Sequence, residues 1–94
     1  MIAGFKSKAL KRYWTKGDPS KIRPDWVETI RIILSRLEAA REPSEMNVPG
    51  LGFHPLKGDR KGEYAVSVSR NWRMTFSWDD ENAIDVNLED YHGD

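Results

Sequence analysis

The sequence predicts an α+β fold in which two N-terminal helices pack on a small antiparallel sheet, as a single domain over residues 1–94. In the first half, apolar residues recur at three- and four-residue spacing in two stretches, as they do in amphipathic helices. In the second half, apolar and polar residues alternate in three segments, as they do in strands with one buried face. A chain of this length can bury one modest core, and its lack of cysteine excludes disulfides and thiolate metal sites.

The first helix is expected over residues 8–15, after a short apolar opening at residues 2–5 that could form a strand. Ser7 is a suitable N-cap, Leu10 lies on the apolar side, and Gly17 can end the helix. The segment is basic, with cations at Lys6, Lys8, Lys11, Arg12 and Lys16. A solvated helix face and a face that contacts RNA or the ribosome both account for this charge.

The second helix carries the strongest helical pattern in the chain. Asp25 can cap its start, with Glu28 three residues later as in a capping box, and it should end near residues 40–41, before Pro43. Its apolar stripe is expected to form core rather than a groove for a partner: Val27, Ile30, Ile33, Leu34 and Leu37. A loop is then expected as far as Gly52.

Three strands are expected to form an antiparallel meander, with turns at residues 69–71 and 79–82. One face of each strand is apolar, and the two helices are the available cover for it. The apolar sets are Tyr64, Val66 and Val68, then Trp72, Met74, Phe76 and Trp78, then Ile84, Val86 and Leu88. The opposite face is expected to be wet or to face a ligand: Ser67, Arg73, Thr75, Ser77, Asp85 and Asn87.

The formal net charge of zero hides a strong asymmetry along the chain. All fifteen Lys and Arg residues precede residue 74, whereas residues 79–94 contain seven Asp and Glu and no cation. The first 78 residues hold eight acidic residues against those fifteen cations, which leaves a formal charge of +7. This excess favours an anionic partner, and the acidic end could also fold back on the basic part.

The stretch His54–Arg73 joins a histidine, a basic loop with two glycines and two strands. Its cations are Lys57, Arg60, Lys61, Arg70 and Arg73, opposed only by Asp59 and Glu63. A flexible cationic loop beside a sheet can cradle a phosphate group. A solvated hairpin, whose charges keep a sheet edge soluble, accounts for the same pattern.

The residue types favour metal-free cleavage of RNA. In that reaction a base removes the proton of a ribose 2′-hydroxyl, which attacks the adjacent phosphate, while cations stabilise the added charge and an acid protonates the 5′-oxygen. His54, Lys57, Arg73 and His92 could supply these groups if the fold brings them together. A metal site built from His54, Asp90 and His92 is a weaker alternative, and no nucleophile motif supports serine hydrolase chemistry.

Four short stretches carry a resemblance to a known family. They are His54–Gly62 (HPLKGDRKG), Asn71–Arg73 (NWR), Glu89–His92 (EDYH) and the opening pair Phe5-Lys6. On these stretches, and over essentially its whole length, the chain resembles the HigB toxins of bacterial toxin–antitoxin systems, within the wider RelE-like group. The resemblance implies the same α+β fold and an endoribonuclease, an mRNA interferase, that needs no cofactor.

The resemblance also implies roles for individual residues. His54 and His92 would be the acid/base pair, with the assignment between them open, and Asp90 would orient or tune His92. Tyr91 would stack on or position the substrate, and it would share the polar sheet face with Arg73 if the last strand extends that far. The cations would act on phosphate: Arg73 and Lys57 on the developing charge, and Arg60, Lys61 and Arg70 on the RNA backbone.

The implied biology is translation inhibition in the cytoplasm, by cleavage of mRNA in the ribosomal A site. The implied partners are the ribosome and a HigA-like helix-turn-helix antitoxin, with operator DNA contacted only through the antitoxin complex and no membrane involved. Two readings without cleavage remain open. One is an RNA- or ribosome-binding module that stalls translation by occupancy, and the other is a degenerate homologue that serves only as a transcriptional partner.

Overall fold

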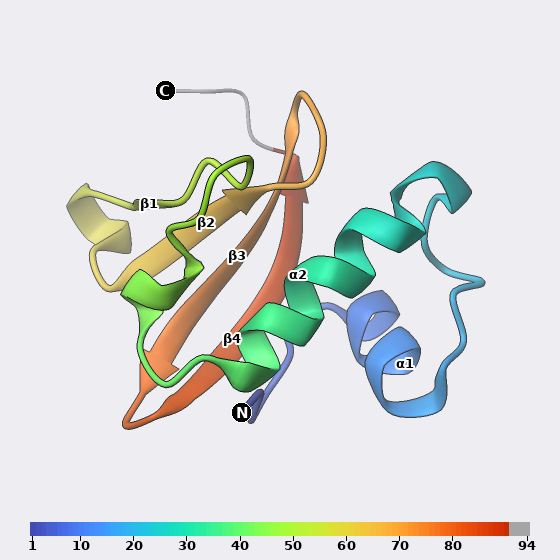
Figure 1. Cartoon of the computed structure of the whole chain (residues 1–94), viewed down its shortest axis with the longest axis horizontal. Helices are drawn as coiled ribbons and strands as arrows, with labels where there is room; N and C mark the ends of the chain where they lie inside the picture. Colours follow the sequence, from blue (N-terminus) through green and yellow to red (C-terminus); the bar gives the residue numbers. More distant parts are fainter. Residues whose placement is uncertain (91–94) are drawn as a thin grey trace.

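The computed structural model describes residues 1–90 as two layers, with helices on one face of a four-stranded antiparallel sheet (Figure 1). Helix α2 (Val27–Ala39) lies across the sheet, and α1 (Lys8–Lys16) lies beside the last strand. The strands are β1 (His54–Pro55), β2 (Glu63–Ser67), β3 (Trp72–Asp79) and β4 (Asn82–Asp90), in that spatial order. The α+β architecture expected from the sequence is confirmed.

Helix α1 begins and ends as its sequence predicts. The Ser7 hydroxyl accepts a hydrogen bond from the Leu10 amide at 3.1 Å, which satisfies one of the unpaired amides of the first turn. Gly17 ends the helix with φ of 68°, a left-handed conformation that costs glycine little, and its amide bonds to the Tyr13 carbonyl. Leu10 is fully buried, so α1 contributes to the common core.

Helix α2 begins differently from the expectation. Pro24 starts a 3-10 turn over Pro24–Trp26 that runs directly into the helix, and no side chain caps it. The Asp25 carboxylate instead pairs with Arg23, and Glu28 pairs with Arg31, so the predicted capping box is wrong. Proline supplies the helical φ at the first turn and has no amide to satisfy there.

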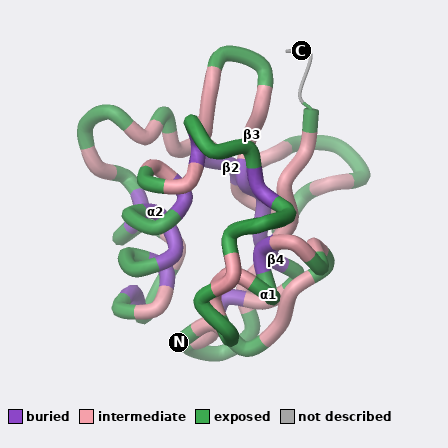
Figure 2. The backbone as a smooth tube through the Cα atoms, turned by 90° about the vertical axis from the view of Figure 1, so that its right-hand side faces the viewer, coloured by how far each residue is buried: buried purple, intermediate pink, exposed green. Residues whose placement is uncertain are grey.

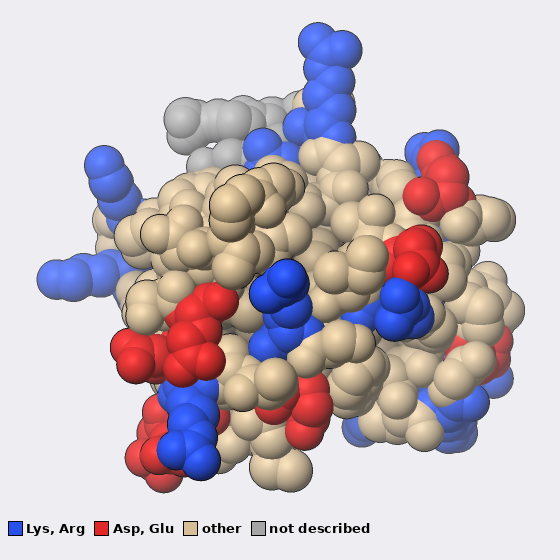
Figure 3. Space-filling model, viewed as in Figure 1, with Lys and Arg blue, Asp and Glu red and all other residues tan. Residues whose placement is uncertain are grey.

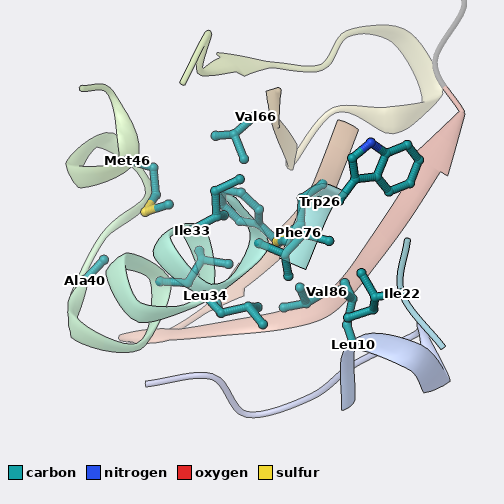
Figure 4. Packing of buried hydrophobic residues seen from close by; sticks show 14 residues of the cluster. Leu10, Ile22, Trp26, Ile33, Leu34, Ala40, Met46, Val66, Phe76 and Val86 are labelled. Carbon is teal, nitrogen blue, oxygen red and sulfur yellow. The ribbon is translucent and has the colours of Figure 1, made fainter. Parts of the chain in front are cut away.

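The core lies between α2 and the sheet. The predicted stripe of α2 is buried at Ile30, Ile33, Leu34 and Leu37, where the helix faces the strands (Figure 2). These side chains meet Val66 and Phe76 from the sheet, with Met46 covering one end and Leu10 the other (Figure 4). Met46 belongs to a 3-10 turn, Pro43–Met46, inside the segment that was expected to be loop.

The sheet register confirms the predicted alternation in β2 and β3. Tyr64 stands opposite Phe76, and Val66 opposite Met74, on the face that α2 covers. The short strand β1 was not expected, and it pairs His54 with Ala65. Two residues are too few to show a period of two, so no sequence pattern could reveal this strand.

Strand β4 departs from simple alternation at a bulge. Thr75 pairs with Asn87 but Ser77 pairs with Ile84, so β4 has one extra residue at this point. Asp85 occupies the bulge with φ of 53°, a left-handed conformation that aspartate tolerates better than most residues. The bulge shifts the alternation, so Ala83 faces the core in place of Ile84, contrary to the expected set.

The first residues of the chain run parallel to β4 along its outer edge. Bridges join Ile2 with Ala83 and Phe5 with Val86. Five backbone hydrogen bonds of 2.7 to 3.2 Å run along this edge, from the amides of Ala83 to Met1, Ala3 to Ala83, Val86 to Gly4, and Lys6 and Ser7 to Val86. The apolar opening that could have formed a strand therefore forms two isolated bridges. It covers the edge that β4 would otherwise expose.

Candidate active site

The face of the sheet opposite α2 brings several predicted site residues together. The register places His54, Ala65 and Thr75 in one cross-strand row, with Arg73 two residues before Thr75 on β3. His54 and Arg73 therefore share this polar face, two strand spacings of about 5 Å each apart across the sheet and two residues, about 7 Å, apart along the strand direction. The face is not fully wet as expected, because Thr75 on it is only 2% exposed.

Arg73 is held at the start of β3 by carbonyl oxygens of the preceding turn. Its Nη1 lies 3.0 Å from the Ser69 carbonyl and 3.3 Å from those of Arg70 and Trp72. These contacts position the half-buried guanidinium and shape the turn that carries the exposed Arg70. Arg73 is thus a fixed cation at one end of the polar face.

His54 is half-buried and oriented by the backbone just before it. Its Nδ1 lies 3.1 Å from the Gly52 carbonyl oxygen, which can only accept, so Nδ1 carries the proton. In the neutral ring Nε2 is then the basic nitrogen, as a proton acceptor needs. Gly52 has φ of 60°, and a Cβ there would lie 2.9 Å from the Ser67 hydroxyl oxygen. The contact between His54 and the Gly52 carbonyl therefore depends on a glycine at position 52.

The loop between β1 and β2 presents two exposed lysines beside a hollow of about 430 Å³. Lys57 and Lys61 line this hollow with apolar and glycine neighbours, namely Pro55, Leu56, Gly58, Gly62 and Tyr64. Basic side chains project over this loop and over the β2–β3 turn in Figure 3. An apolar floor with cations at its rim can hold a base and its phosphate.

Arg60 lies on the same polar face but is engaged by two carboxylates. Its guanidinium bonds to Glu63 at 2.8 Å and to both oxygens of Glu89, at 2.8 and 2.7 Å. Glu89 also accepts the Thr75 hydroxyl hydrogen bond at 2.6 Å. Hydrogen bonds from Arg60 and then Thr75 lower the pKa of Glu89, against partial burial, and the two carboxylates raise the pKa of Arg60.

Asp90 is not brought to this face. It stands opposite Trp72, whose side chain packs against the core, so the register directs Asp90 to the α2 side. Tyr91 and His92 lie outside the described residues. The structure thus unites His54, Arg73 and Arg60 on one face and Lys57 and Lys61 on the adjoining loop.

Sequence reasoning missed the carboxylates of this site. Glu63 and Glu89 have the parity of Ala65 and Asn87, so they were recognisable as polar-face residues, but nothing local indicated that they bind one arginine. Among residues 1–90, no three His, Asp or Glu side chains are grouped to hold a metal ion. No helix in the same range is long and apolar enough to cross a membrane.

Comparison with known proteins identifies relatives along nearly the whole chain. Residues 3–92 match the sequence model of the HigB-like toxin family, described as RelE-like toxins of the type II toxin–antitoxin system HigB. Endoribonuclease HigB of Proteus vulgaris is 40% identical over 92 residues, which cover 98% of this chain and 100% of that protein. Toxin HigB-1 of Vibrio cholerae serotype O1 is 29% identical over 91 residues, 95% of this chain and 96% of the relative.

Solved structures with little sequence similarity share the fold. A mutant of YafQ from Escherichia coli superposes with a TM-score of 0.61 at 13% identity, covering 96% of this chain and 93% of that one. The YoeB dimer from Staphylococcus aureus gives 0.60 at 20% identity, with 98% of both chains covered. The two helices and the antiparallel sheet are therefore a recurrent architecture.

Proposed function

The chain belongs to the HigB-like family of RelE-like toxins of type II toxin–antitoxin systems, and from this premise we propose that it is a ribosome-dependent endoribonuclease that cleaves mRNA. The observation that carries the proposal is the placement of His54 and Arg73 on one sheet face, in a chain 40% identical to a protein named Endoribonuclease HigB. A proton acceptor and a fixed cation on one surface are what 2′-hydroxyl attack on a phosphodiester requires.

The chemistry divides between these groups. A histidine takes the proton of the 2′-hydroxyl, and the oxygen attacks the adjacent phosphorus as the 5′-oxygen leaves with a proton from a second acid. His54 and His92 are the proposed pair, with Asp90 orienting His92 and Tyr91 positioning the substrate. Arg73 and Lys57 stabilise the added negative charge on the phosphate, so the protein's own residues account for each role.

The path of the RNA is proposed to run from the turn at Arg70 past Arg73 to the β1–β2 loop. Lys57 and Lys61 are exposed at the rim of the hollow there, where cations can contact phosphates while a base rests on the apolar floor. The excess of positive charge in residues 1–78 supports binding to ribosomal RNA as well.

A toxin of a type II system has an antitoxin as its partner, and we propose a HigA-like helix-turn-helix protein for this one. In this proposal the toxin reaches operator DNA only through that antitoxin. The toxin acts in the cytoplasm, where it meets messages in the ribosomal A site.

Induction in bacteria followed by mapping of mRNA 5′ ends tests the function directly. New ends within translated codons are expected from the wild type and not from Arg73→Ala. Growth arrest without new ends would favour the alternative in which the protein stalls ribosomes by occupancy. If neither new ends nor growth arrest is observed, the remaining function is that of a transcriptional partner.

A single 2′-deoxy nucleotide at the mapped cut site tests the chemistry. The substitution removes the proposed nucleophile and leaves base pairing, stacking and the phosphate nearly unchanged. Cleavage of that bond on a programmed ribosome should stop while binding persists. With the normal message, the upstream product should end in a 2′,3′-cyclic phosphate or 3′-phosphate and the downstream product in a 5′-hydroxyl. A 5′-phosphate would indicate attack by water.

A further inference from the structure

We infer that Arg60 is a positioning residue that joins the β1–β2 loop to the end of β4 through Glu89, rather than a direct contact to RNA. The inference rests on the proposed function, because it concerns the geometry of that site. The prediction that Arg60 binds the RNA backbone stays untested, and the contacts of its guanidinium favour the positioning role.

The contacts of Arg60 span the sheet. From the loop, its guanidinium reaches Glu63 at the start of β2 and both carboxylate oxygens of Glu89 near the end of β4. Two parallel hydrogen bonds from arginine to one carboxylate fix direction as well as distance. The Thr75 hydroxyl, on the strand between them, bonds to the same Glu89 carboxylate. Loop, central strand and last strand are thus joined at one point.

The junction of Arg60 with Glu89 and Thr75 matters for catalysis because Glu89 directly precedes proposed site residues. Asp90, Tyr91 and His92 follow it directly, and they are the proposed orienting, substrate and acid/base residues. The loop at the other end of the junction carries Lys57 and Lys61. A misplacement of about 1 Å in such groups can cost about a hundredfold in rate. Arg60 therefore acts on catalysis through the strand and loop that it connects.

Arg60 also offsets negative charge beside the substrate. Glu89 stands directly opposite Arg73 in the register, and Lys6 lies close enough to lower the pKa of Glu89 further. The guanidinium of Arg60 therefore offsets two carboxylates of the protein itself, those of Glu63 and Glu89. An arginine whose guanidinium is already bonded to two carboxylates binds a phosphate only weakly.

Steady-state cleavage on programmed ribosomes separates positioning from direct contact. Arg60→Gln and Glu89→Gln should each lower kcat by about 10- to 100-fold with KM nearly unchanged. The double variant should be no worse than the poorer single one, because both changes break one junction. Arg60→Lys should recover only part of the rate, since lysine cannot make the paired bonds. The contrasting variant Lys61→Gln removes a proposed RNA contact, so it should raise KM while kcat stays nearly the same.

Several outcomes would overturn the inference. Direct contact with RNA predicts that Arg60→Gln raises KM and reduces the salt dependence of binding, whereas Glu89→Gln leaves the rate intact or improves binding. Arg31→Gln is the matched control, because it breaks an arginine–glutamate pair on the exposed side of α2 and should change neither constant. Thermal unfolding of every variant excludes loss of fold. If the wild type itself does not cleave, the proposed function fails; if it cleaves and kcat survives in both glutamine variants, only the positioning role fails.

Discussion

Glu89 and Arg73 stand directly opposite each other in neighbouring strands, and the Glu89 carboxylate is bonded to Arg60 and Thr75. A third residue thus supplies the charge that balances this carboxylate at the site. The arrangement places two arginines and one glutamate around the central strand of the polar face.

Replacement of Arg73 by alanine should lower cleavage by about 10²–10³-fold, because it removes the cation that we propose to stabilise charge in the transition state. Arg73 also bonds to carbonyls of the β2–β3 turn, so some stability should be lost as well. Single-turnover cleavage and circular dichroism would be measured together. An alanine variant that remains folded and cleaves at the wild-type rate would remove Arg73 from the mechanism. The same measurement on His92→Ala tests the proposed acid/base partner.

Charge reversal at Lys57 and Lys61 should weaken ribosome binding, and the remaining binding should depend less steeply on salt. Each phosphate contact that is lost reduces the number of counterions released on binding. The magnitude of the slope of log K against log salt should therefore fall by about 1 per contact. Co-sedimentation with ribosomes over a range of salt concentrations measures this slope. Arg36→Glu, on the exposed side of α2, changes the charge as much as reversal of either single lysine, and this control should have a smaller effect than each single reversal. Binding of the wild type that does not respond to salt would contradict the proposed basic surface.

Glu89 should make stability depend on pH in the acidic range. Its folded-state pKa lies below the ordinary value, so its stabilising contribution is complete above an unfolded pKa of about 4.3 and is lost as pH falls toward the folded pKa. Glu89→Gln should therefore lower the free energy of unfolding at pH 7 by about 1 kcal/mol, a figure reduced for the solvent exposure of the pair.

Denaturant unfolding of the wild type and Glu89→Gln at several pH values tests this dependence. The difference between the two proteins should shrink below about pH 4, where the unfolded wild-type chain takes up a proton at Glu89 that the folded protein resists. Comparing the difference removes the contribution of other carboxylates whose pKa is lowered in the folded protein, such as Asp18, which accepts a hydrogen bond from Arg12. A difference that stays constant down to pH 2 would mean that the Arg60–Glu89 pair contributes nothing to stability.

The bulge at Asp85 should reject β-branched residues. Asp85→Val should destabilise the protein by about 1–2 kcal/mol, because its φ of 53° brings Cβ close to the backbone. Asp85→Asn is the matched variant and should be nearly neutral, since asparagine also tolerates this conformation. Thermal or urea unfolding would compare the two. Equal stability of both variants would show that the bulge relaxes at little cost.

Much of the fold could be predicted because its signals are local. The caps of α1, the stripe of α2 and the alternation in β2 and β3 each depend on residues within a few positions. The bulge at Asp85 could not be predicted, since a left-handed residue in a strand is selected by packing of the sheet as a whole. The same holds for β1, which exists only because β2 pairs with it.

The residue types of the candidate site could be proposed from the sequence, but the hydrogen bonds and ion pairs between them could not be predicted. Parity placed Arg73 on the polar face correctly, but the shared bonding of Arg60 by Glu63 and Glu89 joins residues 29 positions apart and has no local signal. From the sequence, Arg60 is therefore assigned to the RNA backbone together with Lys61, in the loop that also carries Lys57. In the structure they differ, because the two lysines are exposed whereas Arg60 lies in an ion-pair network.

The opening segment along β4 limits how a partner can bind. Backbone amides and carbonyls of Ala83 and Val86 are already paired with the opening segment, so no strand can be added over this stretch unless that segment is first displaced. The other edge offers only the two residues of β1, and Pro55 has no amide to donate. Addition of a strand is thus hindered along residues 83–86 of one border and at Pro55 of the other. We therefore expect an antitoxin that leaves the opening segment in place to contact side chains, rather than backbone groups, along this stretch.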